Sequence, residues 1–327
     1  MVLVSVVVPT RNRPEGLRAC LDALSAQTVA DFDVLLGDDA SDVPASDLVT
    51  SDLRGRLDIR VLRNDAQRGP AFTRNRAIEA ARGEYIAFVD DDVRVVPTWL
   101  ETHLAAHTHS AVALASIGPL AAPADWDAEP WTRWEARTLQ REYDRMARGV
   151  YAPTWRQFHT GNAVLARAAL QDVGGFDDSF GRAEDIEAAR RMAARGLEFT
   201  FLPEAIGWHY SHRTMDAWLA VAHAYGGADW RMDRMYPESG WLAQVERELA
   251  RRHPALRTIR RLTEFAGRPR WLARVLAGTG GVLDGLHMNR GASAALSAAY
   301  ELEYLRGLEA AAEESFSLRA HLGDARS

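Results

Sequence analysis

The sequence predicts an α/β protein with a doubly wound, mostly parallel sheet and a helical extension at its C-terminal end. Two observations carry this prediction. Apolar, β-branched runs alternate with segments of helical periodicity through the first part of the chain, and after Tyr210 the pattern is almost wholly helical. Strands separated by helices of this length predict parallel pairing with right-handed crossovers.

The first apolar run, "LVSVVV", is continuous rather than alternating, which suits a strand buried on both faces. The following helix, over 14–28, begins with Pro14 at a favourable first position and has leucines at helical spacing on one face. The sequence then predicts strands over 31–37 and 58–63, a helix over 70–83, and a strand over 84–89. This order resembles a doubly wound nucleotide-binding half.

The pattern changes between Trp126 and Trp155, where tryptophans and charges follow each other with weak periodicity. Order returns with "TGNAVLARAALQDVGGFDDSF", a helix over 184–196 and a strand over 197–203. No internal repeat is visible. The chain therefore reads as an α/β region that is followed by helices.

Composition narrows the function classes. The 327 residues are 47% hydrophobic, enough for a sizeable core, and 39 basic against 45 acidic residues give a net charge of −6. This mixed balance predicts no general attraction to nucleic acid or to an anionic membrane. The single cysteine, Cys20, excludes an internal disulfide and is expected in the core. With no leader pattern or membrane-spanning run recognised, a soluble, cytoplasmic protein is expected.

Acidic residues gather where the predicted strands end. "PTRNR", "DDASD", "NDAQRG" and "DDD" follow four successive strands, at the rim where open α/β sheets bind ligands. Asp90 and Asp92, two apart at a strand end, are expected to point the same way. Carboxylates so close raise one another's pKa unless a cation neutralises them, and Mg²⁺ or Mn²⁺ is the simplest such cation. Turns or helix caps are the alternative explanation for each pair.

The ordered set of motifs resembles a family 2 glycosyltransferase of the GT-A fold. The set runs from "VSVVVPTRNRPEG" through "DDASD", "RGPAFTRNRAIEAARGEYIAFVDDD", "TGNAVLARAALQDVGGFDDSFG" and "AEDIEAARRMAARG" to "WHY". The match covers residues 4–212. It implies a nucleotide-sugar-binding half over 1–116, an acceptor-binding and catalytic half over 117–212, and a helical extension over 213–327.

The resemblance implies a metal-dependent transfer of a sugar from a nucleoside diphosphate sugar to an acceptor hydroxyl, with inversion. It implies Asp185 as the general base, Glu184 as its acidic neighbour, and Asp92, Asp90 and His209 as metal ligands. The nucleotide-sugar contacts that it implies are Pro9, Thr10, Arg13, Asp38, Asp39, Arg74, Asp90, Asp91, Gly161 and Asn162. Either Asp38 or Asp39 is expected at the base.

The sequence supports four further expectations about individual residues. Asp185 opens a predicted helix, whose N-terminus is expected to favour the ionised carboxylate. Ala40 replaces the glycine usual in this family's "DDGS" pattern, which calls for an ordinary backbone conformation or a mild adjustment. His212 lies near His209 in sequence, at a spacing that suits a shared metal, although a core role is as plausible. Four tryptophans fit either sugar stacking or cover for a core edge: Trp126, Trp131, Trp134 and Trp155.

Rival functions and partners stay open. A sugar nucleotidylyltransferase would be expected to carry a glycine-rich, basic loop after its first strand, whereas "PTRNRPEG" is poor in glycine. A non-catalytic nucleotide-sugar or glycan-binding module is the other alternative. UDP-sugars are the first expectation for the donor, with GDP- and dTDP-sugars open, and the acceptor is a glycan, a lipid-linked glycan or a small metabolite. The helical extension fits packing, a homodimer or peripheral contact with a membrane.

Overall fold

The computed structural model describes residues 3–250 and 268–324, which form two compact units. The first unit holds the chain up to Trp126 together with Ala136–Ser211, and the second holds Asp127–Glu135 together with the chain from His212 onward. Each unit is described by itself. The predicted functional halves, 1–116 and 117–212, both fall mainly in the first unit, and their assignment to donor and acceptor stays a prediction.

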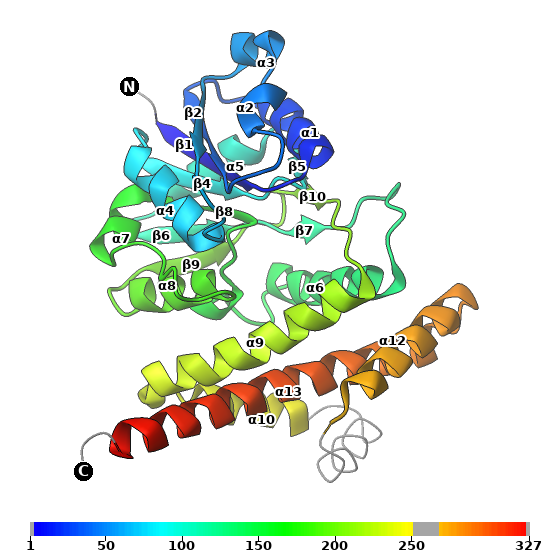
Figure 1. The fold of residues 1–327 in the computed structure, drawn as a ribbon. Coiled ribbons are helices and arrows are strands. Elements are labelled where there is room, and N and C mark those ends of the chain that lie inside the picture. Colours follow the sequence, from blue (N-terminus) through cyan, green and yellow to red (C-terminus); the bar gives the residue numbers. More distant parts are fainter. Residues whose placement is uncertain (1–2, 251–267, 325–327) are drawn as a thin grey trace. The chain divides into compact units, whose positions relative to one another are not determined.

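A seven-stranded sheet forms the centre of the first unit (Figure 1). Its order is β3-β2-β1-β4-β8-β6-β9. The strands are β1 (Val4–Thr10), β2 (Phe32–Asp38), β3 (Ile59–Arg63), β4 (Tyr85–Val89), β6 (Leu114–Ile117), β8 (Asn162–Ala166) and β9 (Glu198–Phe201). The first four are parallel, and β6 and β9 are parallel to each other, while β8 is antiparallel to both of its neighbours. The predicted α/β fold with a mostly parallel sheet is confirmed.

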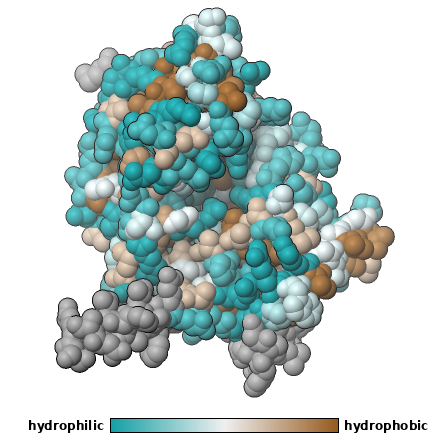
Figure 2. Space-filling view, in the orientation of Figure 1, coloured by the Kyte–Doolittle hydropathy of each residue, from teal (hydrophilic) through white to brown (hydrophobic). Residues whose placement is uncertain are grey.

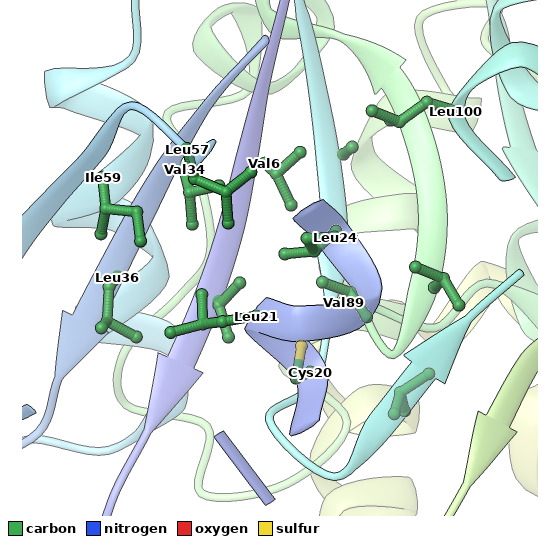
Figure 3. Close-up of a cluster of buried hydrophobic side chains, with 14 of the residues drawn as sticks. Val6, Cys20, Leu21, Leu24, Val34, Leu36, Leu57, Ile59, Val89 and Leu100 are labelled. Atoms are coloured by element: carbon green, nitrogen blue, oxygen red, sulfur yellow. The ribbon is translucent and has the colours of Figure 1, made fainter. Parts of the chain in front are cut away.

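Helices cover both faces of this sheet. They are α1 (Pro14–Ser25), α2 (Ala45–Leu48), α3 (Ser51–Arg56), α4 (Pro70–Ala80), α5 (Trp99–Thr108), α7 (Arg167–Asp172) and α8 (Glu184–Ala193), with the short 3₁₀ turn η1 (Trp155–Gln157). Side chains of β1 alternate between the faces, so that Val6 and Val8 pack with α1 while Val7 packs on the opposite side. Figure 3 shows Cys20, Leu21 and Leu24 of α1 against the sheet. Cys20 is a buried core residue, as predicted.

A second sheet of three short strands lies in the same unit and was not predicted. It consists of β5 (Val93–Val95), β10 (Gly207–His209) and β7 (Leu120–Ala121), in the order β5-β10-β7. Because β5 and β10 run antiparallel, His209 pairs with Val93, directly after the acidic triplet. Strands of two or three residues carry too little periodicity to be recognised from sequence. This small sheet brings a late histidine to the acidic rim.

The second unit is helical, as expected for the extension. It contains α9 (Met215–Met235), the 3₁₀ turn η2 (Pro237–Ser239), α10 (Trp241–Ala250), α12 (Arg270–Gly285) and α13 (Asn289–Asp324), and residues 130–135 of α6 (Pro130–Ala147). Trp134, Trp218 and Tyr300 pack against one another in its core. Glycines at Gly226 and Gly307 let α9 and α13 approach closely, because a Cβ at either position would collide with the opposite backbone. Within the described residues, no helix combines the length and apolarity that a membrane span requires.

Candidate active site

The parallel strands align their carboxyl ends, which brings the segment after β1 to the segment after β4. Thr10 Oγ1 donates a hydrogen bond of 2.7 Å to Asp91 Oδ2. Arg13 Nη1 lies 3.1 Å from Asp91 Oδ1 and 2.6 Å from Asp92 Oδ2. Burial raises the pKa of Asp91 to about 6, since the partly exposed Arg13 offsets only part of the cost of desolvation. Pro9 lies beside Gly37 on β2, one residue before this cluster.

The acidic triplet lies in a turn, not on a strand. β4 ends at Val89, and the amide of Val93 donates to the carbonyl of Asp90 at 3.1 Å, so the chain reverses direction between these residues. Asp90 consequently faces Arg74, whereas Asp92 faces Arg13. The expectation that Asp90 and Asp92 point the same way is wrong, because the two-residue alternation of a strand does not apply within a turn.

Arg74 joins the triplet to the acidic pair at the start of α8. Arg74 Nη2 lies 3.0 Å from Asp90 Oδ1, and Arg74 Nη1 lies 2.8 Å from Glu184 Oε1. Arg74 and Glu184 expose only 6% and 9% of their side chains, so little water screens their attraction. The guanidinium thus connects two acidic motifs that are more than ninety residues apart in sequence.

Asp185 lies directly beyond this ion pair. Its Oδ1 accepts a hydrogen bond from the amide of Ile186 at 2.8 Å, and its Oδ2 accepts one from the amide of Thr160 at 3.3 Å. Burial nevertheless raises the pKa of Asp185 above its ordinary value, because desolvation outweighs Arg74 and the two amides. The expectation that the helix N-terminus would favour the ionised form of Asp185 is therefore wrong, because burial has the larger effect on its pKa. A carboxylate with a raised pKa is the better proton acceptor.

Left-handed backbone conformations occur at three non-glycine residues of this rim. Asn12 has φ +55°, Ala40 has φ +57°, and Ala183, directly before Glu184, has φ +63°. Asparagine tolerates this region, but alanine is strained there. The expectation of an ordinary or mildly adjusted conformation at Ala40 is wrong, because the alanine keeps the conformation that glycine adopts most easily. Strain of this kind persists where the surrounding structure holds a loop in place.

Asp38 and Asp39 organise loops with their carboxylates. Asp38 accepts from the amides of Ser41 at 2.8 Å and Ala45 at 3.0 Å, and from Arg63 Nη1 at 2.6 Å. Burial opposes ionisation, but the hydrogen bonds from Ala45 and Ser41 outweigh it and hold the pKa of Asp38 below its ordinary value. These contacts are typical of the turn explanation, and contact of Asp38 with a base stays a prediction.

Asp39 fixes the loop that leads into α4. It accepts from Asn64 Nδ2 and the amide of Arg68, both at 2.8 Å, and from the amide of Gly69 at 2.9 Å. Because α4 carries Arg74, this loop places the arginine that joins the two acidic motifs. Arg63 and Asn64 were not singled out from sequence, although both belong to the segment after the third strand that was expected at the rim.

Gly161 and Asn162 occupy different environments. A Cβ at Gly161 would lie 3.2 Å from Asp90 Oδ2, so glycine permits this backbone to lie against the triplet. Asn162 is fully buried, with Oδ1 accepting from Trp99 Nε1 at 2.7 Å. Its Nδ2 donates to the carbonyls of Pro119 at 2.9 Å and Ala205 at 2.8 Å. The structure therefore uses the Asn162 side chain to hold strands together and does not bring it to the rim.

Two histidines lie near the triplet. His209 Nε2 is 3.4 Å from Asp92 Oδ1. His159, which sequence reasoning missed, has both ring nitrogens buried without a well-formed hydrogen bond to any residue that the structure describes. Its pKa falls to about 4 through burial, while the charge of Asp90 opposes the shift and His209 adds to it. The only sequence signal was its position next to "TGN".

The side chains at the triplet fit a hard divalent cation. Carboxylate oxygens and an imidazole are suitable ligands for Mg²⁺ or Mn²⁺. Among the described residues, no three His, Cys, Asp or Glu side chains are grouped so that they could hold a metal by themselves. Mg²⁺ in proteins commonly takes one or two carboxylates and completes its coordination with substrate phosphates and water. Asp92 with His209 is the pair that fits this arrangement.

Other candidates lie apart from this cluster. His212 Nδ1 is 3.7 Å from Glu129 Oε2, both in the helical unit. Trp134 is core, and Trp131 Nε1 donates to the carbonyl of Arg213 at 2.7 Å. Trp155 lies half-buried in the first unit, within reach of Arg156 and Arg190. Trp126 is also half-buried in the first unit, so acceptor contact stays a prediction for Trp126 and Trp155.

The profile of "Glycosyl transferase family 2" matches residues 5–174, more than half of the chain. The chain belongs to this family. It is 30% identical over 228 residues to the pre-mycofactocin glycosyltransferase of Mycobacterium tuberculosis, covering 69% of this chain and 46% of that protein. It is 31% identical over 243 residues to the validoxylamine A glucosyltransferase of Streptomyces hygroscopicus, covering 66% and 57%. The chain thus spans about half the length of the curated relatives it matches.

Solved structures show the same fold. The mannosyltransferase PcManGT from Pyrobaculum calidifontis, in complex with GDP-Man and Mn²⁺, superposes with a TM-score of 0.54 at 22% identity, over 68% of this chain and 61% of that one. TarS 1-349 from S. aureus, in complex with UDP-GlcNAc, superposes with a TM-score of 0.51 at 18% identity, over 92% and 90%. The predicted GT-A fold is confirmed.

Proposed function

We propose that the chain transfers a sugar from a nucleoside diphosphate sugar to an acceptor hydroxyl with inversion at the anomeric carbon. One observation carries the proposal: Arg74 is ion-paired on one side to Asp90 and on the other to Glu184, whose neighbour is Asp185. A single buried cation therefore connects the acids proposed for the donor to the carboxylate proposed as base. Family membership and the fold support the same reaction class.

We assign the donor to the rim between β1, β2 and β4. Pro9 and Thr10 end β1 and Arg13 follows it, while Asp38 ends β2 and Asp39 follows it. The solved relatives were crystallised with donors of different bases, GDP-Man and UDP-GlcNAc, so family membership alone leaves the base open. A UDP-sugar is our first proposal, with a hydroxyl of a glycan, a lipid-linked glycan or a small metabolite as acceptor.

Asp92 and His209 would hold Mg²⁺ or Mn²⁺ beside the diphosphate, while Asp90, the third ligand that the resemblance implied, faces Arg74. When bound, such an ion stabilises the negative charge that develops on the departing diphosphate. Arg74 adds a positive charge next to Asp90. Because Glu184 also holds the Arg74 side chain, this charge is in position before the reaction. Arg13 has more freedom to move, since half of its side chain is exposed.

Asp185 takes the proton of the acceptor hydroxyl. The acceptor oxygen forms its bond to the anomeric carbon from the face opposite the leaving group, the bond to the diphosphate oxygen breaks, and its electron pair leaves with the diphosphate. Because burial raises the pKa of Asp185, the carboxylate gains basicity. Glu184 is the less suitable base, since its Oε1 accepts a hydrogen bond from Arg74 Nη1 at 2.8 Å.

The test is a turnover assay with UDP-, GDP- and dTDP-sugars, with Mn²⁺ or with a chelator, and with a panel of hydroxyl acceptors. We expect release of a nucleoside diphosphate together with a glycosylated acceptor, in the presence of metal. A parallel assay with UTP and glucose 1-phosphate tests the alternative of a nucleotidylyltransferase, which would join the two and release pyrophosphate. Tight donor binding without turnover across the acceptor panel would indicate a binding module and contradict the proposal.

A further inference from the structure

Exposed hydrophobic side chains are concentrated on α12 of the second unit and on the three residues that follow it. Ten large hydrophobic residues are exposed within 3–250 and 268–324, and five of them belong to the stretch 271–288. These five, each exposing 54–65% of its surface, are Trp271, Val275, Val282, Leu286 and Met288. The view in Figure 2 shows hydrophobic residues gathered where α12 ends in Figure 1. Single exposed apolar residues are ordinary, but a group of five in eighteen residues requires an explanation.

The exposed hydrophobic residues of α12, together with its C-cap residue Leu286, share one side of the helix. Trp271, Val275, Val282 and Leu286 follow each other at intervals of four or seven, which places them on one face. The opposite face is buried through Ala273, Ala277, Gly280 and Asp284. We call the group of Trp271, Val275, Val282 and Leu286 the α12 apolar face. The helix is therefore packed on one side, and its second, apolar side is left exposed by residues 3–250 and 268–324.

Positive charge flanks the α12 apolar face. Arg270 and Arg274 are exposed at the start of α12, and Arg290 is exposed just after its end. The acid in this stretch, Asp284, is buried and lies 2.5 Å from Arg133. Arg274 is paired with the exposed Asp216, which reduces but does not reverse the local charge. The basic balance of this segment contrasts with the net charge of −6 of the whole chain, from which no attraction to anionic surfaces was expected.

We propose that the α12 apolar face docks on the surface of an anionic lipid bilayer, with the helix lying in the plane of the interface. An apolar face that buries a tryptophan, leucine and valines among the acyl chains, beside arginines that meet headgroup phosphates, is the combination that binds interfaces. Trp271 suits the boundary because its ring is apolar and its indole N–H is polar. The proposal concerns where the protein works and does not depend on the reaction that it catalyses.

A second copy of the chain is the less favourable occupant. In a symmetric pair, each α12 apolar face would bring Arg270 and Arg290 of both copies toward one another, and like charges repel. Gly278 and Gly285 interrupt the surface beside the face, with open space where a Cβ would be. A helix pair needs side chains that interlock at such positions, whereas lipid adapts to an uneven surface.

Flotation with vesicles tests the proposal. The full-length protein is mixed with vesicles of phosphatidylcholine containing phosphatidylglycerol, and separately with phosphatidylcholine alone, at low and at high salt. We expect binding to the anionic vesicles that is about tenfold or more stronger than to the neutral ones and that weakens with salt. The variant Val282→Ser with Leu286→Ser should bind about tenfold more weakly. The matched control Val150→Ser, at an exposed valine of the other unit, should bind as the wild type does.

Charge and assembly are separated by two further measurements. Arg270→Gln with Arg290→Gln should lower the preference for anionic vesicles while leaving donor turnover in solution unchanged. Equal flotation of wild type and the Val282→Ser, Leu286→Ser variant would overturn the proposal, as would absence of binding at low salt. Sedimentation velocity of the same proteins detects self-association, and a dimer that this double substitution dissociates, without vesicle binding, would assign the face to a second copy.

Discussion

Arg74 and Glu184 form a buried ion pair, with 2.8 Å between Arg74 Nη1 and Glu184 Oε1. The pair joins the helix that follows β3 to the helix that carries Asp185, and the same guanidinium reaches Asp90 at 3.0 Å. Its position means that the charge balance of the site and its geometry depend on one side chain.

Replacing Arg74 by methionine should destabilise the first unit strongly. Glu184 would be left buried without its partner, a loss that costs about 3–5 kcal/mol. Adding Glu184→Gln should restore part of the stability, because the amide carries no charge to be buried. Urea unfolding of wild type, Arg74→Met and the double variant measures this. Arg54→Met, at an exposed arginine, is the control and should shift the free energy of unfolding by about 0.5 kcal/mol or less. Equal loss in single and double variants would contradict the explanation.

Asp185→Asn should abolish transfer without weakening donor binding. The amide cannot accept the proton of the acceptor hydroxyl, and loss of a general base lowers turnover about 10²–10⁴-fold. Calorimetric titration with the donor, alongside the turnover assay, separates binding from chemistry. Asp172→Asn, at an exposed residue of α7, is the control and should keep full turnover. Turnover that persists in Asp185→Asn would remove the assignment of the base.

Asp92→Ala should lose the metal-dependent part of donor binding. Asp92 lies 3.4 Å from His209 Nε2, so its removal leaves the proposed cation with one ligand fewer on the protein. Donor titrations with Mn²⁺ and with a chelator should differ in wild type and coincide in the variant. Asp31→Ala, an exposed aspartate before β2, should behave as wild type. A metal dependence that survives in Asp92→Ala would exclude this residue as a ligand.

Ala40→Gly should stabilise the protein, contrary to the usual effect of glycine. Ala40 has φ +57°, where a Cβ is strained, so relief of strain exceeds the entropy cost of glycine by about 0.5–1 kcal/mol. The same substitution at Ala105, exposed within α5, should instead destabilise by about 1 kcal/mol. Thermal and urea unfolding of both variants provide the comparison. Loss of stability in both variants would show that Ala40 is not strained.

Acid should destabilise the first unit through buried neutral histidines. Burial lowers the pKa of His103 to about 3 and that of His159 to about 4. Histidines in the unfolded chain bind protons near pH 6.5, whereas these two bind them in the folded protein only at lower pH. The free energy of unfolding therefore has its full value above pH 6.5 and falls as the pH decreases toward the pKa values of the folded protein. The slope is about 1.4 kcal/mol per pH unit for each histidine.

His103→Gln tests this dependence. Between pH 6 and pH 4, the free energy of unfolding of the variant should fall less steeply than that of the wild type, by the contribution of one histidine. The reason is that the unfolded variant no longer binds that proton. This difference in slope is expected whatever the stability of the variant at pH 7. His109→Gln, at an exposed histidine, is the control. Urea unfolding across this pH range provides the slopes, and parallel curves for wild type and His103→Gln would contradict the prediction.

Much of the fold could be predicted because its signals are local. The β-branched run of β1, the leucine spacing of α1 and the apolar run of β4 each reveal their structure within a few residues. The meeting of the segment at the end of β1 with the acidic triplet after β4 followed from parallel pairing alone. The three-stranded sheet was missed because its strands of two or three residues pair only through contacts that are distant in sequence.

The roles of individual site residues were harder to predict, because they depend on tertiary partners. The Asn162 side chain forms hydrogen bonds with Trp99, Pro119 and Ala205, and nothing in "TGNA" indicates these partners. The raised pKa of Asp185 reflects burial, which a helix-start motif does not report. The Arg74–Glu184 pair likewise required the fold to bring distant segments together.

Burial of Cys20 has a practical consequence for spectroscopy. The thiol has no exposed surface, and burial raises its pKa well above the ordinary value, so little thiolate is available to alkylating reagents. A maleimide dye would accordingly label a cysteine introduced at the exposed Thr279 of α12, and Cys20 would not have to be replaced first. The emission of such a dye could follow the approach of this helix to vesicles in real time.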